Sequence, residues 1–273
     1  MTHYKECFHN HTYYCDGKNS PEEMVRSAVE KNFTALGFSG HAYIKDFLCG
    51  WCMDAEKSAK YLKEIDELKQ KYKDKINLYA GTELDYYCTD VPGNYQFKIG
   101  SVHYVKKEEN YLAVDHNCET TLENIRQYYN GNSIDFAVDY YKNVADVLNK
   151  FDADIIGHFD LITKFNEAEF IIDTGSKKYI NAWHDAVDAL LPYDKPFEIN
   201  TGAIAKGHRT TPYPALDIAD YIHSKGGFFI ITSDCHNADY IDCFFDESLK
   251  IYSKYNIISF EKFLTENKKE SII

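Results

Sequence analysis

Histidines and carboxylates stand at or just beyond the ends of short apolar runs, and this repeated arrangement restricts most strongly how the chain can fold. The strand-like runs lie near 5–12, 34–41, 77–84, 97–104, 153–159, 196–201 and 227–234. Every one of these runs except that at 196–201 has such residues at or just after its end, and they include six of the eleven histidines. The set consists of His9, His11, Asp16, His41, Glu83, His103, His158, Asp234 and His236.

Helical patterns separate the strand-like runs. The first helix is predicted to begin at Ser20, because a serine, then Pro21 and two acids are the residue types of a helix N-terminus. Further helices are predicted near 54–74, 121–130, 134–150, 177–191, 214–225 and 246–254. Strand and helix alternating in about seven units predict a parallel sheet that closes into an α/β barrel.

In such a barrel, the residues at the carboxyl ends of the strands converge on one face. Any one histidine at a strand end is more often an ordinary hydrogen-bonded or surface residue than a metal ligand. Nine polar residues in matching positions would be costly to bury together without cations. Imidazole nitrogen and carboxylate oxygen suit zinc, manganese or iron, so the joint interpretation is one site for divalent metal ions.

Spacing within the set supports this interpretation. His9 and His11 are two residues apart in a strand-like run, so both imidazoles share a face. Asp234 and His236 repeat that spacing at the last strand. Glu83 is the expected bridging carboxylate, because its two oxygens can serve two cations. Asp16 alone could be an ordinary turn residue.

Length and composition limit the alternatives. A chain of 273 residues, 44% of them hydrophobic, is expected to form a single barrel domain over 1–273. A formal net charge of −13 argues against nucleic acid or an anionic membrane as a partner. The N-terminus shows no signal peptide and no run has membrane-spanning length, so a cytoplasmic enzyme with reduced cysteines is expected. The pair Cys49 and Cys52 could be a redox motif or half of a zinc site, but is interpreted as part of a loop.

The combined motifs resemble those of the PHP superfamily, named for its polymerase-associated and histidinol-phosphatase members. The matching segments are FHNHTYYCDG, GFSGH, GTELD, GSVHYV, IIGHFD and SDCH, which together span residues ~5 to ~240. The resemblance implies a distorted TIM-like (β/α)7 barrel with two to three divalent metal ions (Zn, Mn or Fe). The segments VDYYKNVADVL and EINTGAIAKGHRTTPYP look in particular like the monofunctional histidinol-phosphate phosphatases.

Carried onto this chain, the resemblance implies three groups of metal ligands. A first metal would bind His9, His11, Glu83 and Asp234; a second would bind Glu83, His103 and His158; a third would bind Asp16, His41 and His236. The implied reaction is hydrolysis of L-histidinol phosphate to L-histidinol and phosphate, in histidine biosynthesis, by a metal-activated hydroxide.

Several residues outside the metal set are expected to assist. Asp160 is a candidate general acid, with a role as a turn residue or as a partner of a metal ligand as the alternative. Lys164, Lys206 and Arg209 are candidates for phosphate binding, or are solvated surface charges. The segments 42–53 and 105–120 are expected to be loops that wall the site or lie on the surface. Asp85 or Asp115 could meet a substrate amine.

Other functions remain open at this level. The same ligand set would serve a phosphoesterase for another small phosphomonoester, a nucleotide or a phosphotyrosine peptide. A non-catalytic metal-binding module is a third possibility, which the complete ligand set and the absence of a basic surface tract disfavour. The sequence gives no indication of the oligomeric state.

Overall fold

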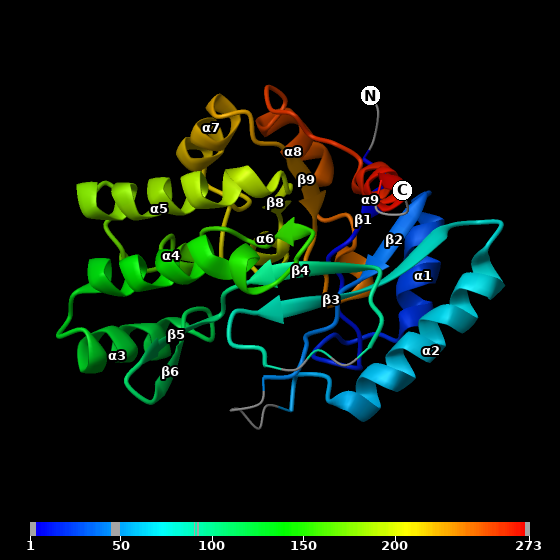
Figure 1. Cartoon of the computed structure of the whole chain (residues 1–273), viewed down its shortest axis with the longest axis horizontal. Coiled ribbons are helices and arrows are strands. Elements are labelled where there is room, and N and C mark those ends of the chain that lie inside the picture. Colours follow the sequence, from blue (N-terminus) through cyan, green and yellow to red (C-terminus); the bar gives the residue numbers. More distant parts are fainter. Residues whose placement is uncertain (1–3, 45–49, 90, 92, 271–273) are drawn as a thin grey trace.

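Seven parallel strands form the central sheet of the computed structural model, as the strand-like runs predict (Figure 1). The structure describes residues 4–44, 50–89, 91 and 93–270. The strands follow one another around the sheet in chain order, and every neighbouring pair is parallel. They are β1 (Glu6–Cys7), β2 (Ala35–Phe38), β3 (Asn77–Asp85), β4 (Phe97–Ser101), β7 (Ile155–Ile156), β8 (Phe197–Asn200) and β9 (Phe229–Thr232).

The first and last strands approach each other at their carboxyl ends. The backbone N–H of His11 donates to the carbonyl of Cys235 over 2.8 Å, and the N–H of Cys235 donates to the carbonyl of His9 over 3.1 Å. These two hydrogen bonds form a short parallel bridge, which lies just beyond the ends of β1 and β9. The sheet is therefore a distorted α/β barrel that is nearly closed, with its tightest join beside the predicted metal ligands.

Aromatic side chains fill the opposite end of the barrel. The Phe8 ring lies 5.3 Å from the Phe97 ring and 4.8 Å from that of Phe260, which belongs to the last helix, α9 (Phe260–Glu270). Gly81 of β3 makes room for this packing, since a Cβ there would stand 2.4 Å from the Phe97 ring. Apolar packing thus plugs one end of the barrel and leaves the polar residues at the other.

Helices cover the outside of the barrel (Figure 1). Those predicted from the sequence are present within a few residues of the expected limits, and the short α6 and the C-terminal α9 were not predicted. Ser20 caps α1 as expected, because its side chain accepts from the backbone of Glu23 while the Glu23 carboxylate accepts from that of Ser20. The helices before α9 are α1 (Pro21–Glu30), α2 (Ala55–Tyr72), α3 (Cys118–Tyr128), α4 (Ser133–Lys150), α5 (Lys177–Leu190), α6 (Gly202–Ala205), α7 (Leu216–Ser224) and α8 (Phe245–Ile251).

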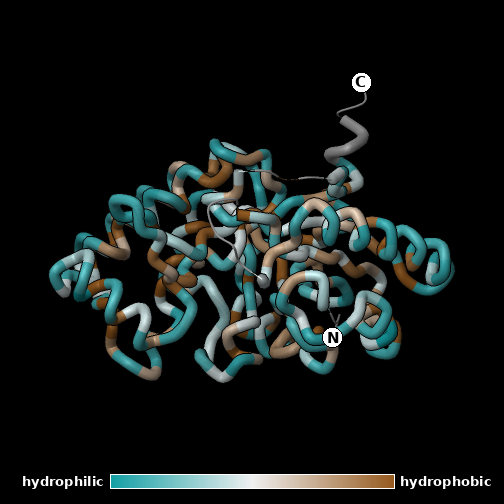
Figure 2. The backbone as a smooth tube through the Cα atoms, turned by 90° about the horizontal axis from the view of Figure 1, so that it is seen from below, coloured by the Kyte–Doolittle hydropathy of each residue, from teal (hydrophilic) through white to brown (hydrophobic). Residues whose placement is uncertain are grey.

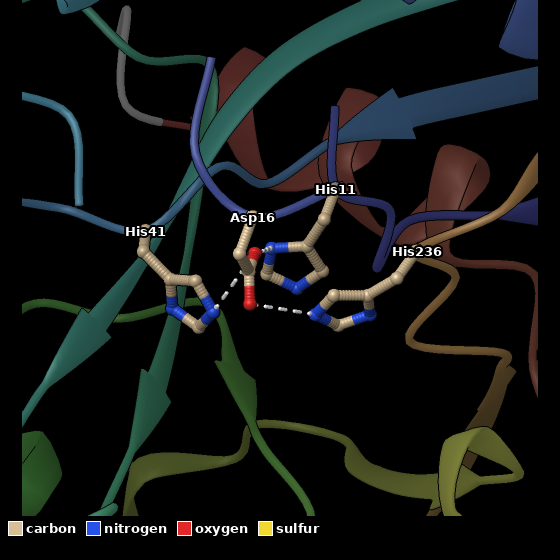
Figure 3. A group of neighbouring side chains, drawn as sticks. All are labelled: His11, Asp16, His41 and His236. Atoms are coloured by element: carbon tan, nitrogen blue, oxygen red, sulfur yellow. Dashed lines mark hydrogen bonds and ion pairs between the residues drawn. The ribbon is translucent and has the colours of Figure 1, made fainter. Parts of the chain in front are cut away.

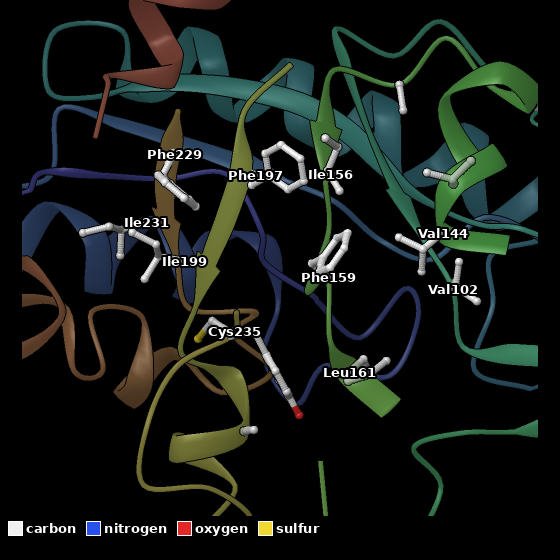
Figure 4. Packing of buried hydrophobic residues seen from close by; sticks show 14 of the residues in the cluster. Val102, Val144, Ile156, Phe159, Leu161, Phe197, Ile199, Phe229, Ile231 and Cys235 are labelled. Atoms are coloured by element: carbon white, nitrogen blue, oxygen red, sulfur yellow. The ribbon is translucent and has the colours of Figure 1, made fainter. Parts of the chain in front are cut away.

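A larger apolar layer lies between the strands and the helices. Phe197 and Ile199 of β8 point into it beside Phe229 and Ile231 of β9, because alternate residues of a strand face the same side (Figure 4). The outer helices bury hydrophobic residues in this layer, and along them the backbone changes between hydrophilic and hydrophobic residues (Figure 2). None of the helices in the described part of the chain has both the length and the apolar character needed to span a membrane.

The segment 105–120 differs from the predicted loop. It contains most of an antiparallel hairpin, formed by β5 (Tyr104–Lys107) and β6 (Asn110–Ala113), and the start of α3. The turn of the hairpin places Glu108 at a φ of 53°, a conformation that glycine or asparagine usually occupies, so the usual sequence signal is missing. Of the Cys49–Cys52 pair, Cys49 lies outside the described residues, while Cys52 is buried.

Candidate metal centre

All nine predicted metal ligands meet at the carboxyl ends of the strands. The histidines leave the ends of β1, β2, β4, β7 and β9, while Glu83 lies within β3 and Asp16 lies in the turn before α1. Many of them line a pocket of about 340 Å³. Its wall also includes Trp51, from the segment 42–53, and Ala113 and Asp115, from the segment 105–120. The convergence expected of parallel strands is therefore present.

Glu83 occupies the centre of the group, and only 1% of its surface is exposed. Its Oε2 atom lies 3.2 Å from His9 Nε2, 3.4 Å from His11 Nε2 and 3.1 Å from His41 Nδ1. Its other oxygen, Oε1, faces a different pair of rings. The two oxygens of one carboxylate are thus divided between two sets of imidazoles.

The pair beside Oε1 consists of His158 and His103. The Nε2 atom of His158 is 3.0 Å from Oε1 of Glu83, and that of His103 is 3.5 Å away. The donor atoms of His9, Glu83 and His158 are mutually close enough to share one cation. His103 is thus slightly farther from Glu83 than His158 is.

Two aspartates complete the arrangement. Asp234 Oδ1 lies 3.2 Å from His11 Nε2 and 3.6 Å from His9 Nε2, so these three residues form a second potential metal group. Asp16 Oδ2 lies 3.1 Å from His236 Nε2 (Figure 3). Its Oδ1 atom lies 3.6 Å from His41 Nε2, so the third expected group also comes together.

His11 lies between these last two groups. Its Nε2 faces Asp234, whereas its Nδ1 is 3.5 Å from Asp16 Oδ1. The His11 ring is stacked on His236 with 4.2 Å between ring centroids. The structure therefore places His11 beside Asp16, His41 and His236 as well as in its expected group.

The donor atoms at the centre are buried and lack hydrogen bonds to described residues. They are His9 Nε2, His11 Nε2 and Glu83 Oε2. Native proteins seldom leave buried polar atoms without a partner. Imidazole nitrogens and carboxylate oxygens that face one another in this way fit divalent cations such as zinc, manganese or iron. The clusters have the donor set of a site for several metal ions.

Electrostatics within the cluster favour ionised carboxylates. Burial alone would raise the pKa of Glu83 and Asp234, but the neighbouring imidazoles, joined by Lys206 in the case of Asp234, outweigh it and hold both pKa values well below their usual range. Burial together with His236 and His41 lowers the pKa of His11 to about 3. His11 is therefore neutral near pH 7, as a metal-binding imidazole must be.

Glu198 was not predicted, yet it contacts two of the strand-end histidines. This fully buried residue of β8 has its Oε1 atom 2.6 Å from His9 Nδ1, while its Oε2 accepts from the backbone N–H of His158 over 2.9 Å and from Asn200 over 3.1 Å. A proton on His9 Nδ1, donated to Glu198, leaves Nε2 free to bind a cation. The sequence feature that could have indicated this role is a charged residue inside the short strand segment FEIN.

Asp85 plays a similar part beside His103. It is 2% exposed, its Oδ2 atom accepts from the backbone N–H of His103 over 2.8 Å, and it lies 3.4 Å from the ring Nδ1. Period-two alternation along β3 puts Asp85 on the same side as Glu83. The same strand therefore provides the central carboxylate and a support for one of its neighbouring rings.

Two of the predicted phosphate-binding cations line the pocket. Lys164 Nζ donates to the carbonyl of Asp115 over 2.9 Å and lies 3.0 Å from its Oδ2 atom. Lys206 is exposed at the end of α6 and lines the same pocket. Asp115, the proposed partner of a substrate amine, already holds Lys164.

The remaining two candidates lie behind the pocket wall. Asp160 is 1% exposed and Arg209 Nη1 is 3.6 Å from its Oδ2 atom. The same guanidinium donates to Thr163 Oγ1 over 2.6 Å. Burial raises the pKa of Asp160, with Arg209 acting in the opposite sense. Neither Asp160 nor Arg209 is among the residues that line the pocket.

Comparison with known proteins gives a consistent picture. The chain is 25% identical over 247 residues to a protein of Schizosaccharomyces pombe named "Probable histidinol-phosphatase", covering 84% of this chain and 78% of that protein. It is 24% identical over 252 residues to a protein of the same name from Deinococcus radiodurans, covering 89% of this chain and 90% of that protein.

Solved structures share the fold. HisK from Listeria monocytogenes superposes with a TM-score of 0.76 at 21% identity, covering 89% of this chain and 99% of that one. The histidinol phosphate phosphatase of Lactococcus lactis, crystallised with zinc, L-histidinol and phosphate, superposes with a TM-score of 0.69 at 19% identity, covering 93% and 95%. The family model described as the PHP domain matches residues 8–202, more than half of the chain. With its strand-end histidines and carboxylates in the order of that family's motifs, this chain belongs to the PHP family.

Proposed function

We propose that this PHP-family metal-dependent phosphoesterase is a histidinol-phosphatase, which hydrolyses L-histidinol phosphate to L-histidinol and phosphate. The observation that carries the proposal is the division of the Glu83 oxygens between two sets of buried imidazoles. Such a carboxylate can hold two cations close together, an arrangement that suits hydrolysis of a phosphate ester.

The proposed ligands are those expected from the sequence. His9, His11, Glu83 and Asp234 would hold one cation; Glu83, His103 and His158 a second; Asp16, His41 and His236 a third. Because His11 also faces this last group, we propose that it is a shared ligand there. When bound, the cations would supply Lewis-acid charge to the phosphate oxygens and lower the pKa of water.

The chain contributes charge, orientation and a shaped pocket. Glu198 and Asp85 hold the rings of His9 and His103 in place. Lys164 and Lys206 bring positive charge to the pocket wall, where a dianionic phosphate would meet it. In a chain with a formal net charge of −13, such local positive charge is what an anionic substrate requires.

The substrate assignment is supported by the relatives. Two proteins similar over most of this chain are named for histidinol-phosphate hydrolysis, and a structural neighbour was crystallised with L-histidinol and phosphate. The pocket offers the aromatic rings of Trp51 and Tyr104 for an imidazole, and the carboxylate of Asp115, which also pairs with Lys164, for an amine. We propose histidine biosynthesis as the process in which this activity is used.

The decisive experiment is a substrate panel on metal-loaded protein. Bound metals are counted by elemental analysis, and phosphate release is measured from L-histidinol phosphate, a nucleoside monophosphate, a phosphotyrosine peptide and simple phosphomonoesters. Chelator-treated protein, assayed before and after metal is restored, is the matched control. We expect the highest kcat/KM with L-histidinol phosphate. Much faster hydrolysis of another compound would refute the substrate, and no metal-dependent hydrolysis at all would refute the enzyme.

A further inference from the structure

One tyrosine that lines the pocket has a hydroxyl without a hydrogen-bond partner among the described residues. Tyr213 is 1% exposed, and its Oη atom is buried. The residue nevertheless lines the same pocket as Lys164, Lys206 and Asp234. A buried hydroxyl usually has a partner, and leaving one unpaired destabilises the folded protein. An unpaired hydroxyl on a pocket wall therefore points to a ligand that would pair with it.

The ring that carries this hydroxyl is firmly held. The backbone N–H of Tyr213 donates to the carbonyl of Asn200 over 3.0 Å, and that of Asn200 donates back over 2.9 Å. The tyrosine is thereby attached to the carboxyl end of β8. The guanidinium of Arg209 lies over the ring, 4.4 Å from its centroid, and is itself held by Thr163 and Asp160.

This packing assigns a role to two residues that lie behind the wall. Arg209 and Asp160 were expected to bind phosphate and to donate a proton, but neither lines the pocket. Arg209 instead packs on the ring of Tyr213, and Asp160 acts on that ring through Arg209, to which it is paired. A donor held in place before the ligand arrives binds more strongly than a mobile one, because less ordering is required on binding.

The hydroxyl has the chemistry of a donor. Burial raises the pKa of Tyr213 well above its usual value; Arg209 opposes this shift, while Asp160 and the pocket carboxylates of Asp115 and Asp234 add to it. The phenol therefore keeps its proton at neutral pH. The neighbouring ammonium groups of Lys164 and Lys206 on the same wall favour an anionic partner.

We propose that Tyr213 contacts the substrate and donates a hydrogen bond from its hydroxyl to a phosphoryl oxygen. The inference rests on the proposed phosphomonoesterase activity and adds a neutral donor to the side of the phosphate that faces β8 and α6. The group that Tyr213 recognises is the phosphate itself, so its contribution is shared by every phosphomonoester that the enzyme accepts.

The test is Tyr213→Phe in the metal-loaded protein, since this change removes one oxygen and keeps the ring under Arg209. Inorganic phosphate is the probe for binding, measured by calorimetry, and kcat and KM are measured with the best phosphomonoester. We expect phosphate affinity and kcat/KM to fall roughly ten- to hundredfold, the range for a hydrogen bond to a charged group. Metal content should be unchanged, and Tm unchanged or slightly higher, because a buried unpaired hydroxyl is removed.

Tyr141→Phe is the matched control. Tyr141 is also buried at 1% exposure, but its hydroxyl pairs with that of Tyr179 over 3.0 Å and the residue does not line the pocket. Its loss should lower Tm and leave phosphate affinity unchanged. Equal phosphate affinity and kinetics in wild type and Tyr213→Phe would overturn the inference. If the wild type binds phosphate but hydrolyses no phosphomonoester, the proposed function fails, and the binding comparison still decides the role of Tyr213.

Discussion

Replacing Glu198 by glutamine should weaken metal binding without unfolding the protein. The carboxylate accepts from two donors of the metal centre, the ring Nδ1–H of His9 and the backbone N–H of His158. Glutamine has almost the same shape but offers only one acceptor oxygen. Whichever way its amide is turned, an NH2 group faces one of these two donors.

The size of the effect follows from this mismatch. A buried donor left without an acceptor costs about 1–3 kcal/mol. The His9 ring also loses the negative charge that fixes its tautomer and strengthens Nε2 as a ligand. Loss of such a support weakens metal affinity or activity by about 10- to 100-fold, and tenfold corresponds to about 1.4 kcal/mol. The unpaired donor lowers stability with or without metal, whereas the loss of support for His9 acts on metal binding itself, so we expect the metal dissociation constant to rise by about 10- to 100-fold.

Chelator competition at fixed pH, with elemental analysis of the recovered protein, measures this change. Glu6→Gln is the control, because Glu6 is also a buried carboxylate and accepts from Ser259 and from the backbone of Phe260 at the opposite end of the barrel. It should lower Tm and leave metal affinity unchanged. If Glu198→Gln binds metal as tightly as the wild type, Glu198 does not act through His9. If both variants lose affinity equally, the effect is a general loss of stability.

Three further outcomes can be measured. Glu83→Gln should reduce both the number of bound metals and kcat by orders of magnitude, and full activity with a full complement of metals would rule out a bridging role. Burial raises the pKa of Asp115, but Lys164 and His103 outweigh burial and lower this pKa to about 2. The metal-free Asp115→Asn variant should therefore be less stable than the wild type by up to about 2 kcal/mol above pH 4. That difference should vanish as the pH falls through 2 in urea titrations, and a difference independent of pH would contradict the ion pair. Gly81→Ala should cost about 1–3 kcal/mol, because its Cβ meets the Phe97 ring. Gly50→Ala, whose Cβ meets nothing within 4 Å among the described residues, should leave Tm unchanged, and similar Tm values for the two variants would refute the packing argument.

The strand-end ligands could be predicted because their signal is local. An apolar run followed by His or Asp shows where a strand stops, and the spacing of His9 and His11 shows that both share a face. The fold then requires all such ends to meet. The seven parallel strands and their convergence are accordingly present in the structure, and the helices lie within a few residues of their predicted limits.

Other features depended on contacts between distant segments. Glu198 occupies an ordinary strand segment, and only closure of the barrel reveals that it meets His9, 189 positions away in the chain. The hairpin of β5 and β6 lacks a strong turn signal, since Glu108 adopts a positive φ without being Gly or Asn. Arg209 has the charge of a phosphate ligand, but pairing with Asp160 holds it behind the wall. The sequence shows the residue type and its spacing, but not whether the side chain lines the pocket.

The bridge between Cys235 and the segment that carries His9 and His11 has a consequence for the timing of assembly. His11 and Asp234 face each other over 3.2 Å although more than 220 residues separate them in the chain. During synthesis, a growing chain that still lacks β9 holds the earlier histidines but not the last carboxylate. The complete donor group therefore arises only when the final strand docks against the first. Tight metal capture would then mark a finished barrel, and a partly made chain would have little hold on the ion.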